Sequence, residues 1–270
     1  MNNVSKELLV ILRHASIGIL DIRTAESLAS DIVHTLNKLK QIYLRGTYTG
    51  RCDLRLPASL QCISLQKVEC STEWLCSLLI TLSSLDHPVR CNLVDIELQS
   101  SKETRREESY THVSDLRSEF LSRDMSNIEI VVDKVSKELF EILRDTSIEI
   151  LLLKTADGAA CASEILHTLQ RLKKLYLMGT FTGRCEFKLP VSLQYINLQK
   201  SECSSEWLRS LFFTLSSVPH PVRCDLMDVV LQQSEEAREN ESHIHVSDLG
   251  SEKCVFDRSN IEILVQNGSK

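Results

Sequence analysis

The chain has 270 residues, of which 43% are hydrophobic and 25% are charged, with a formal net charge of −6 and a pI near 5.8. This composition is typical of a core-forming protein and excludes the disordered and membrane-spanning classes. The acidic balance argues against nucleic acid as a partner, because phosphate binding needs a concentrated basic face. The apolar run at 8–12 is too short for a signal core or a membrane span. We therefore expect a cytoplasmic protein with neither a membrane nor a nucleic-acid partner.

Apolar spacing predicts alternating helices and strands along the first half of the chain. A connector is expected between 65 and 72, and the acidic stretches at 100–109 and 232–242 are predicted to be solvated loops. Helices are predicted at 4–12, 26–39 and 72–84, with a weaker one at 111–121, and strands at 16–22, 40–50, 60–65, 93–98 and 126–132.

The second half of the chain repeats the first. Residues 46–100 and 179–233 agree at 36 of 55 positions without a gap. A chain that repeats this closely stacks one structural unit more than once. We predict two copies, 1–133 and 134–270. Because no long linker separates them, we expect one continuous stack.

The repeat extends to the beginning and end of each copy. The predicted helix VSKELLVILR at 4–13 returns as VSKELFEILR at 135–144. The closing strand SNIEIVV at 126–132 returns as SNIEILV at 259–265. We therefore expect the second copy to use the same order of elements as the first.

Several predicted strands contain the sequence pattern L-x-x-[LI]-x-L, namely LKQIYL (39–44), LQCISL (60–65), LKKLYL (172–177) and LQYINL (193–198). This pattern resembles the strand segment of leucine-rich repeats, whose units contain about 20–29 residues. The resemblance implies an α/β solenoid of about ten irregular units, built from two duplicated halves. A parallel sheet would form one face. Helices would cover the other face and join each strand to the next.

The repeats are degenerate, and they resemble the C-terminal repeats of intracellular NOD-like immune receptors. Such a resemblance implies a sensor module of innate immunity, in a complete protein or as a fragment of a larger receptor. No phosphate-binding loop of the form G-x-x-x-x-G-K-[ST] occurs in the chain. The Asn or Cys that usually follows the strand is replaced by a glycine or a displaced cysteine, at Gly46, Cys70, Gly179 and Cys203.

The chain contains ten cysteines, and only some of them recur between the copies. A reducing compartment disfavours a disulfide framework, so we predict buried free thiols. Thiolate and imidazole are also the ligands that zinc prefers. The alternative interpretation is therefore a zinc-stabilised tandem structural domain, with ligands from Cys52, Cys70, His87 and Cys91.

The sequence predicts no catalytic site, no cofactor and no bound metal in the preferred interpretation. The usual marks of hydrolases and nucleotide-binding enzymes, G-x-S-x-G, H-E-x-x-H and G-x-G-x-x-G, do not occur. Trp74 and Trp207 are expected to pack a helix against the sheet. The one repeated His/Ser/Asp grouping, which a cryptic enzyme would use, involves His112, Asp115, His245 and Asp248.

The outward positions of the predicted sheet form the candidate binding surface. Tyrosine, arginine and methionine are enriched at protein interfaces. We therefore predict a non-enzymatic recognition or scaffold module that binds a protein partner on its concave sheet face, and we expect the uncapped solenoid ends to permit self-association. The predicted contact residues are Asp21, Arg23, Tyr43, Arg45, Ser64 and Gln66 in the first copy, and Leu152, Lys154, Tyr176, Met178, Asn197 and Gln199 in the second.

Overall fold

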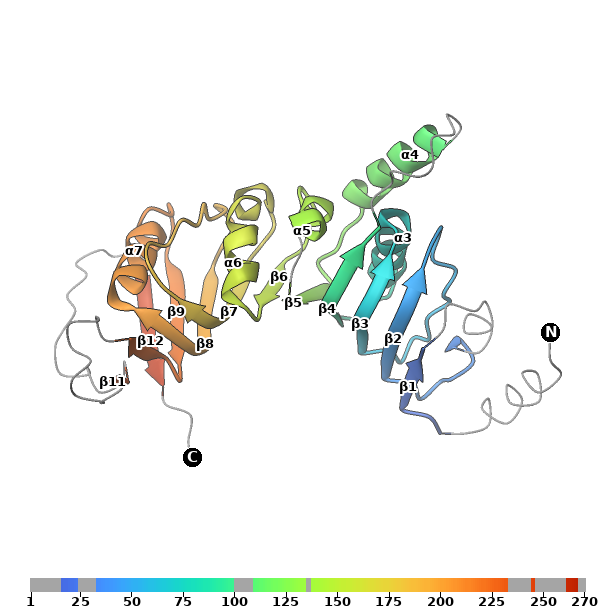
Figure 1. The fold of residues 1–270 in the computed structure, drawn as a ribbon, viewed down its shortest axis with the longest axis horizontal. Coiled ribbons are helices and arrows are strands. Elements are labelled where there is room, and N and C mark those ends of the chain that lie inside the picture. The colour runs from blue at the N-terminus through green and yellow to red at the C-terminus, as the bar shows by residue number, and fades with distance from the viewer. Residues whose placement is uncertain are drawn as a thin grey trace. The chain divides into compact units, whose positions relative to one another are not determined.

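Apolar residues alternate along each strand, and parallel pairing places these residues side by side on one face of a sheet. The computed structural model of the chain describes residues 16–23, 33–99, 109–134, 137–232, 244–245 and 261–266. The chain divides into two compact units, Met1–Ile148 and Glu149–Lys270. In each unit an open sheet carries helices (Figure 1), so the chain is an α/β protein.

The first unit contains five parallel strands in the order β1-β2-β3-β4-β5. Its core residues lie in rows across the sheet. Ile42, Ile63 and Cys91 form one row, Leu44, Leu65 and Leu93 the next, and all six are fully buried. The elements are β1 (Ile19–Ile22), β2 (Gln41–Tyr48), β3 (Cys62–Cys70), α3 (Thr72–Ser83), β4 (Val89–Leu98), α4 (Ser109–Ser122), β5 (Ile128–Asp133) and α5 (Lys137–Leu143).

The second unit has parallel strands in the order β6-β7-β8-β9-β12. A short strand β10 also pairs with β8 in parallel, and β11 pairs with β10 in the antiparallel sense. The elements are β6 (Ile150–Leu153), α6 (Ala156–Ser163), the 3-10 turn η2 (Leu166–Thr168), β7 (Lys174–Phe181), β8 (Tyr195–Ser204), α7 (Ser205–Ser216), β9 (Val222–Met227), β10 (Val230–Gln232), β11 (Ile244–His245) and β12 (Ile261–Gln266).

The division in space falls after Ile148, whereas the sequence copies meet at 133/134. Helix α5 follows β5 and packs against β4, which keeps it in the first unit. Arg117 on α4 holds the end of α5, since its guanidinium donates hydrogen bonds to the carbonyl oxygens of Glu141, Ile142 and Arg144. The expected continuous stacking of the two copies stays a prediction.

The parallel strands predicted around the leucine pattern are present, but two of them are longer than predicted. Strand β3 continues through Cys70 and β8 through Ser204, so the expected connector after Leu65 is wrong. Lys67 lies in the left-handed region with φ of 52°, and it shifts the side-chain alternation by one residue. Val68 and Cys70 therefore face the core, where both are fully buried.

The helix predicted at 72–84 is confirmed as α3, and the weak one at 111–121 as part of α4. The expectation that helices join each strand to the next is wrong for β2 to β3 and for β7 to β8. Residues 49–61 and 182–194 form loops and turns instead. The helix predicted at 26–39 is wrong at its end, where 34–38 are turns or irregular. Residues 26–32 and the helix predicted at 4–12 lie outside the described residues.

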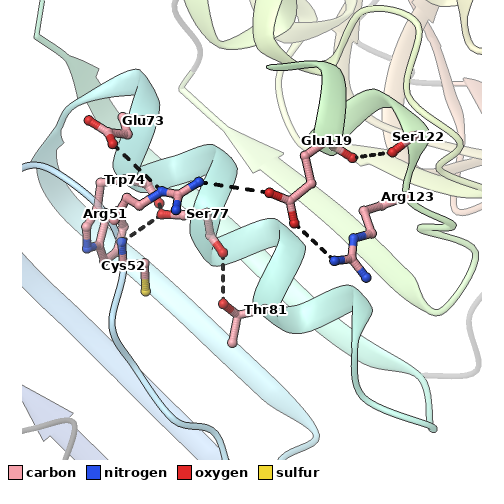
Figure 2. A network of polar contacts seen from close by, with 9 residues as sticks. All are labelled: Arg51, Cys52, Glu73, Trp74, Ser77, Thr81, Glu119, Ser122 and Arg123. Atoms are coloured by element: carbon pink, nitrogen blue, oxygen red, sulfur yellow. Dashed lines mark hydrogen bonds and ion pairs between the residues drawn. The ribbon is translucent and has the colours of Figure 1, made fainter. Parts of the chain in front are cut away.

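A serine of helix α3 fastens the loop that follows β2 (Figure 2). The Cys52 backbone N–H donates to Ser77 Oγ at 2.7 Å, and the same hydroxyl donates to the Trp74 carbonyl at 2.9 Å. Arg51 also pairs with Glu73 at 4.0 Å and with Glu119 on α4 at 3.9 Å. The serine contact recurs in the second unit, where the Cys185 N–H donates to Ser210 Oγ at 2.7 Å.

We predict that Ser77→Ala lowers the free energy of unfolding by about 1–3 kcal/mol, because it leaves the Cys52 N–H without its acceptor. Urea unfolding followed by circular dichroism measures this loss. Ser83→Ala is the control, since this hydroxyl bonds only within α3, to the Ile80 carbonyl, and its loss should stay within about 0.5 kcal/mol. Equal effects of the two substitutions would contradict the role given to Ser77.

Candidate functional site

The sheet face opposite the buried rows, here called the open face, carries the predicted contact residues. In the first unit Asp21, Tyr43 and Ser64 occupy one row of neighbouring positions. In the second unit Leu152, Tyr176 and Asn197 form the corresponding row. The other predicted residues each lie two positions further along the chain. They are Arg23, Arg45 and Gln66 in the first unit, and Lys154, Met178 and Gln199 in the second.

Charged and amide side chains dominate the open face of the first unit. Arg45 Nη2 donates to Gln66 Oε1 at 2.9 Å, and its Nε lies 4.0 Å from Asp21 Oδ1. Arg23 Nη2 lies 3.3 Å from Asp21 Oδ2. Gln66 Nε2 in turn is 3.4 Å from Ser64 Oγ. The register thus joins five of the six predicted residues of this unit into one polar cluster.

The open face of the second unit is built around tyrosines. Tyr176 and Tyr195 meet edge to face, with ring centroids 5.6 Å apart. Tyr195 donates its hydroxyl proton to Asp225 Oδ2 at 2.8 Å, and Asn197 Nδ2 donates to the Tyr195 oxygen at 2.9 Å. Arg223 Nε donates to Asp225 Oδ1 at 2.9 Å. These contacts fix the side chains on three neighbouring strands before any partner arrives.

Sequence reasoning missed Tyr195, Arg223 and Asp225. Tyr195 lies two positions before Asn197 on β8, so strict alternation along the strand would have placed it on the same face. Arg223 and Asp225 lie on β9, opposite Tyr195 and Asn197 in the ladder. The repeat of the predicted strand 93–98 begins only at Leu226, so residues 222–225 were not included in the prediction. Strand β9 begins at Val222, and this longer extent is what places Arg223 and Asp225 beside Tyr195.

The surroundings of this network raise the pKa of two of its groups, Tyr195 and Arg223. Burial raises the pKa of the Tyr195 hydroxyl, and the neighbouring Asp225 carboxylate raises it further against the opposing effect of Asn197. The Asp225 carboxylate also raises the pKa of Arg223 through their hydrogen bond. Tyr195 therefore stays protonated and keeps its role as a donor to Asp225 at neutral pH.

Two buried polar atoms on the open face lack hydrogen-bond partners. In the described part of the chain four such side-chain atoms occur, and two of them are Arg45 Nε and Asn197 Oδ1. Asn197 is only 3% exposed, so water does not readily replace the missing donor. A buried group left unsatisfied costs about 1–3 kcal/mol. Each unit therefore keeps one unsatisfied polar atom on this face, a donor in the first unit and an acceptor in the second.

The repeated tryptophans pack a helix against the sheet, as predicted. Trp74 stacks on Tyr48 with ring centroids 4.4 Å apart, and Trp207 stacks on Phe181 at 4.5 Å. A cavity of about 290 Å³ lies beside Trp207 in the second unit. Phe187 meets Trp207 edge to face at this cavity, so its inner wall is aromatic.

The alternative zinc site is not assembled in the described part of the chain, where no group of three or more His, Cys, Asp or Glu side chains could hold a metal ion. His87 instead directs its Nε2 to the Leu60 carbonyl, and His220 directs its Nε2 to the Val191 carbonyl. Cys91, the fourth residue of the alternative set, is fully buried. The repeated histidines thus fasten the loops that precede β3 and β8.

The repeated His/Ser/Asp grouping takes different structures in the two units. In the first unit its segment lies in helix α4, where Asp115 is exposed. In the second unit His245 belongs to strand β11. Asp248 lies outside the described residues, as do the side chains of His112 and His245. The described residues therefore bring together no triad from this grouping.

None of the nine described cysteines is joined in a disulfide, and five of them are buried. Burial raises the pKa of the Cys52 and Cys185 thiols to about 11, and that of the Cys70 and Cys203 thiols to about 12. The thiolate is the reactive form, so these side chains are weak nucleophiles at neutral pH.

No protein-family model matches the chain, and no curated protein matches it significantly. Among the described residues, no helix is long and apolar enough to cross a membrane.

We predict that iodoacetamide labels Cys70 and Cys203 in unfolded but not in native protein at pH 8, because both thiols are buried and their pKa lies near 12. Peptide mass spectrometry measures the labelled fraction. The labelling of native protein should be the same with and without a chelator. If a chelator exposed Cys52, Cys70 and Cys91 together, the result would favour the zinc-stabilised alternative.

Proposed function

We propose that the chain is a non-enzymatic protein-recognition or scaffold module that binds its partner on the open face. The proposal includes a leucine-rich-repeat-like solenoid built from two duplicated halves, and a role as the cytoplasmic sensor part of an innate-immune receptor. The leucine pattern of the strands supports the solenoid. The degenerate form of the repeats supports the receptor role.

The observation that carries the binding proposal is the pair of unsatisfied atoms on the open face. Arg45 Nε lacks an acceptor and Asn197 Oδ1 lacks a donor. Buried groups without partners are rare in folded proteins and each has an energetic cost. The Arg45 side chain is 43% exposed, so a partner carboxylate could bind its guanidinium. Asn197 Oδ1 is enclosed, so a partner's N–H or O–H group would reach it only if the side chains around it moved. The gain would be specific, since a partner without these groups would leave the atoms unsatisfied.

The surroundings of these atoms support recognition of a protein surface. Tyr176, Tyr195 and Met227 flank Asn197 with aromatic and thioether groups that are only partly buried. Such side chains supply large contact areas at interfaces. The hydrogen bonds of Tyr195 to Asn197 and Asp225 hold its ring in place, which reduces the entropy lost on binding.

We predict that Arg45→Ala and Asn197→Ala each reduce partner capture at least about tenfold, as expected for residues at the centre of an interface. The purified chain serves as bait in a cytosolic extract, and quantitative mass spectrometry compares the captured proteins. Tyr43→Ala and Tyr176→Ala extend the test to the aromatic part of each unit.

The matched control is Phe213→Ser on helix α7, a side chain that is 66% exposed and lies away from the open face. Capture should be unchanged by this substitution. The proposal fails if Phe213→Ser abolishes capture while the four open-face variants retain it. Circular dichroism of every variant shows whether the fold is kept.

A further inference from the structure

The last strand of the second unit exposes apolar side chains on the face that is buried elsewhere. Ile263 and Val265 of β12 are 37% and 40% exposed. Their neighbours in the ladder, Cys224 and Leu226 on β9, belong to the core and are 0% and 2% exposed. The buried rows of this unit therefore reach β12, where α7 contacts the strand but Ile263 and Val265 stay more than one third exposed.

The equivalent strand of the first unit is fully covered. Ile130 and Val132 of β5 correspond to Ile263 and Val265 in the repeated segments SNIEIVV and SNIEILV, and both are 0% exposed. Helix α5 follows β5 directly and packs against its neighbour β4. The apolar side chains that α5 contributes to this core are Leu139, Phe140, Ile142 and Leu143, and all four are buried.

The chain contains a second segment with the sequence of α5. Residues 4–13, VSKELLVILR, match residues 135–144, VSKELFEILR, at eight of ten positions. The buried α5 residues correspond to Leu8, Leu9, Ile11 and Leu12, so the apolar positions are retained. Residues 4–13 lie outside the described residues, and their correspondence to α5 is one of sequence. A helix sequence suited to this kind of strand thus occurs at one end of the chain, and an exposed strand of this kind occurs at the other.

We propose that the protein self-associates head to tail, with residues 4–13 of one molecule covering Ile263 and Val265 of the next. The contact would place beside β12 a helix with the sequence of α5, which follows β5 and packs against β4 in the first unit. Its two surfaces are different, so the interface is heterologous and each molecule keeps one free surface of each kind. Repetition therefore builds rings or open chains. This proposal is independent of binding on the open face.

The proposed contact should depend on concentration. In the first unit, residues 134–136 tether α5 to β5, and such a short link gives a high effective concentration. Two separate molecules lack this tether and lose translational and rotational freedom when they associate. We expect a monomer at high dilution and growing oligomers at high concentration.

Two complementary variants test the proposal by sedimentation velocity. Leu8→Asp combined with Leu12→Asp places charges on the apolar surface of residues 4–13. Ile263→Asp combined with Val265→Asp does the same on the apolar surface of β12. Each variant alone should remain monomeric at concentrations where the unmodified chain forms oligomers. An equimolar mixture should form a one-to-one dimer and nothing larger, because only one intact helix surface and one intact strand surface remain. Formation of this dimer also shows that both variants are folded.

Val191→Asp is the control for loss of an exposed apolar side chain, since Val191 is 62% exposed and lies in the loop before β8. This variant should associate like the unmodified chain. A chain that stays monomeric at every concentration overturns the proposal, as does a mixture without the dimer. Single variants that still form oligomers also overturn it. Arg45→Ala and Asn197→Ala should leave the association unchanged, which separates this result from any failure of partner binding.

Discussion

The structure depends on keeping the buried rows of neighbouring strands in register where the long strands change their side-chain alternation. Strand β3 changes its side-chain alternation at Lys67, and β4 does so at Asp95, each with a positive φ. The register places Val68 opposite Ile96 directly after these residues, so both strands change at the same level. At Gly46, with φ of 107°, a Cβ would lie only 3.1 Å from the Arg23 carbonyl oxygen. A strand that lacked the change at this level would turn its apolar side chains away from the core.

This constraint explains which parts of the fold could be predicted from the sequence. The leucine pattern before the change of alternation has a strict period of two, and it predicted the parallel strands around Ile63 and Ile196 correctly. After this change the apolar residues Val68 and Cys70 are out of phase with Leu65, so the pattern ended too early. The loops after β2 and β7 were mistaken for helical connections, because they are held by contacts from residues far away in the sequence. Ser77 lies 25 positions beyond Cys52, and local periodicity carries no signal for such a bond.

The sequence predicted which face of the sheet carries the candidate site, but it identified only some of the residues on that face. Alternation placed Tyr43, Ser64 and Asn197 on the open face, where the structure has them. It could not indicate that Asp225 lies beside Tyr195, because that contact spans 30 residues and requires the pairing of β8 with β9. Nor can a sequence indicate which polar atoms stay unsatisfied. The missing partner of Asn197 Oδ1 follows from the side chains that surround it on three strands.

The two units combine a nearly constant core with different open faces, and this contrast bears on function. Ile63, Leu65, Cys91 and Leu93 recur unchanged as Ile196, Leu198, Cys224 and Leu226, since any change of volume there would disturb the packed rows. On the open face Cys62, Ser64, Asn92 and Val94 are replaced by Tyr195, Asn197, Asp225 and Met227. These differences are not independent changes at a solvated surface, because Tyr195, Asn197 and Asp225 form one hydrogen-bonded network. Tyrosine, asparagine and aspartate at these positions depend on one another for their geometry. A face that had only drifted would not require three changes to fit together, and this interdependence supports the proposal that the second unit binds a partner there.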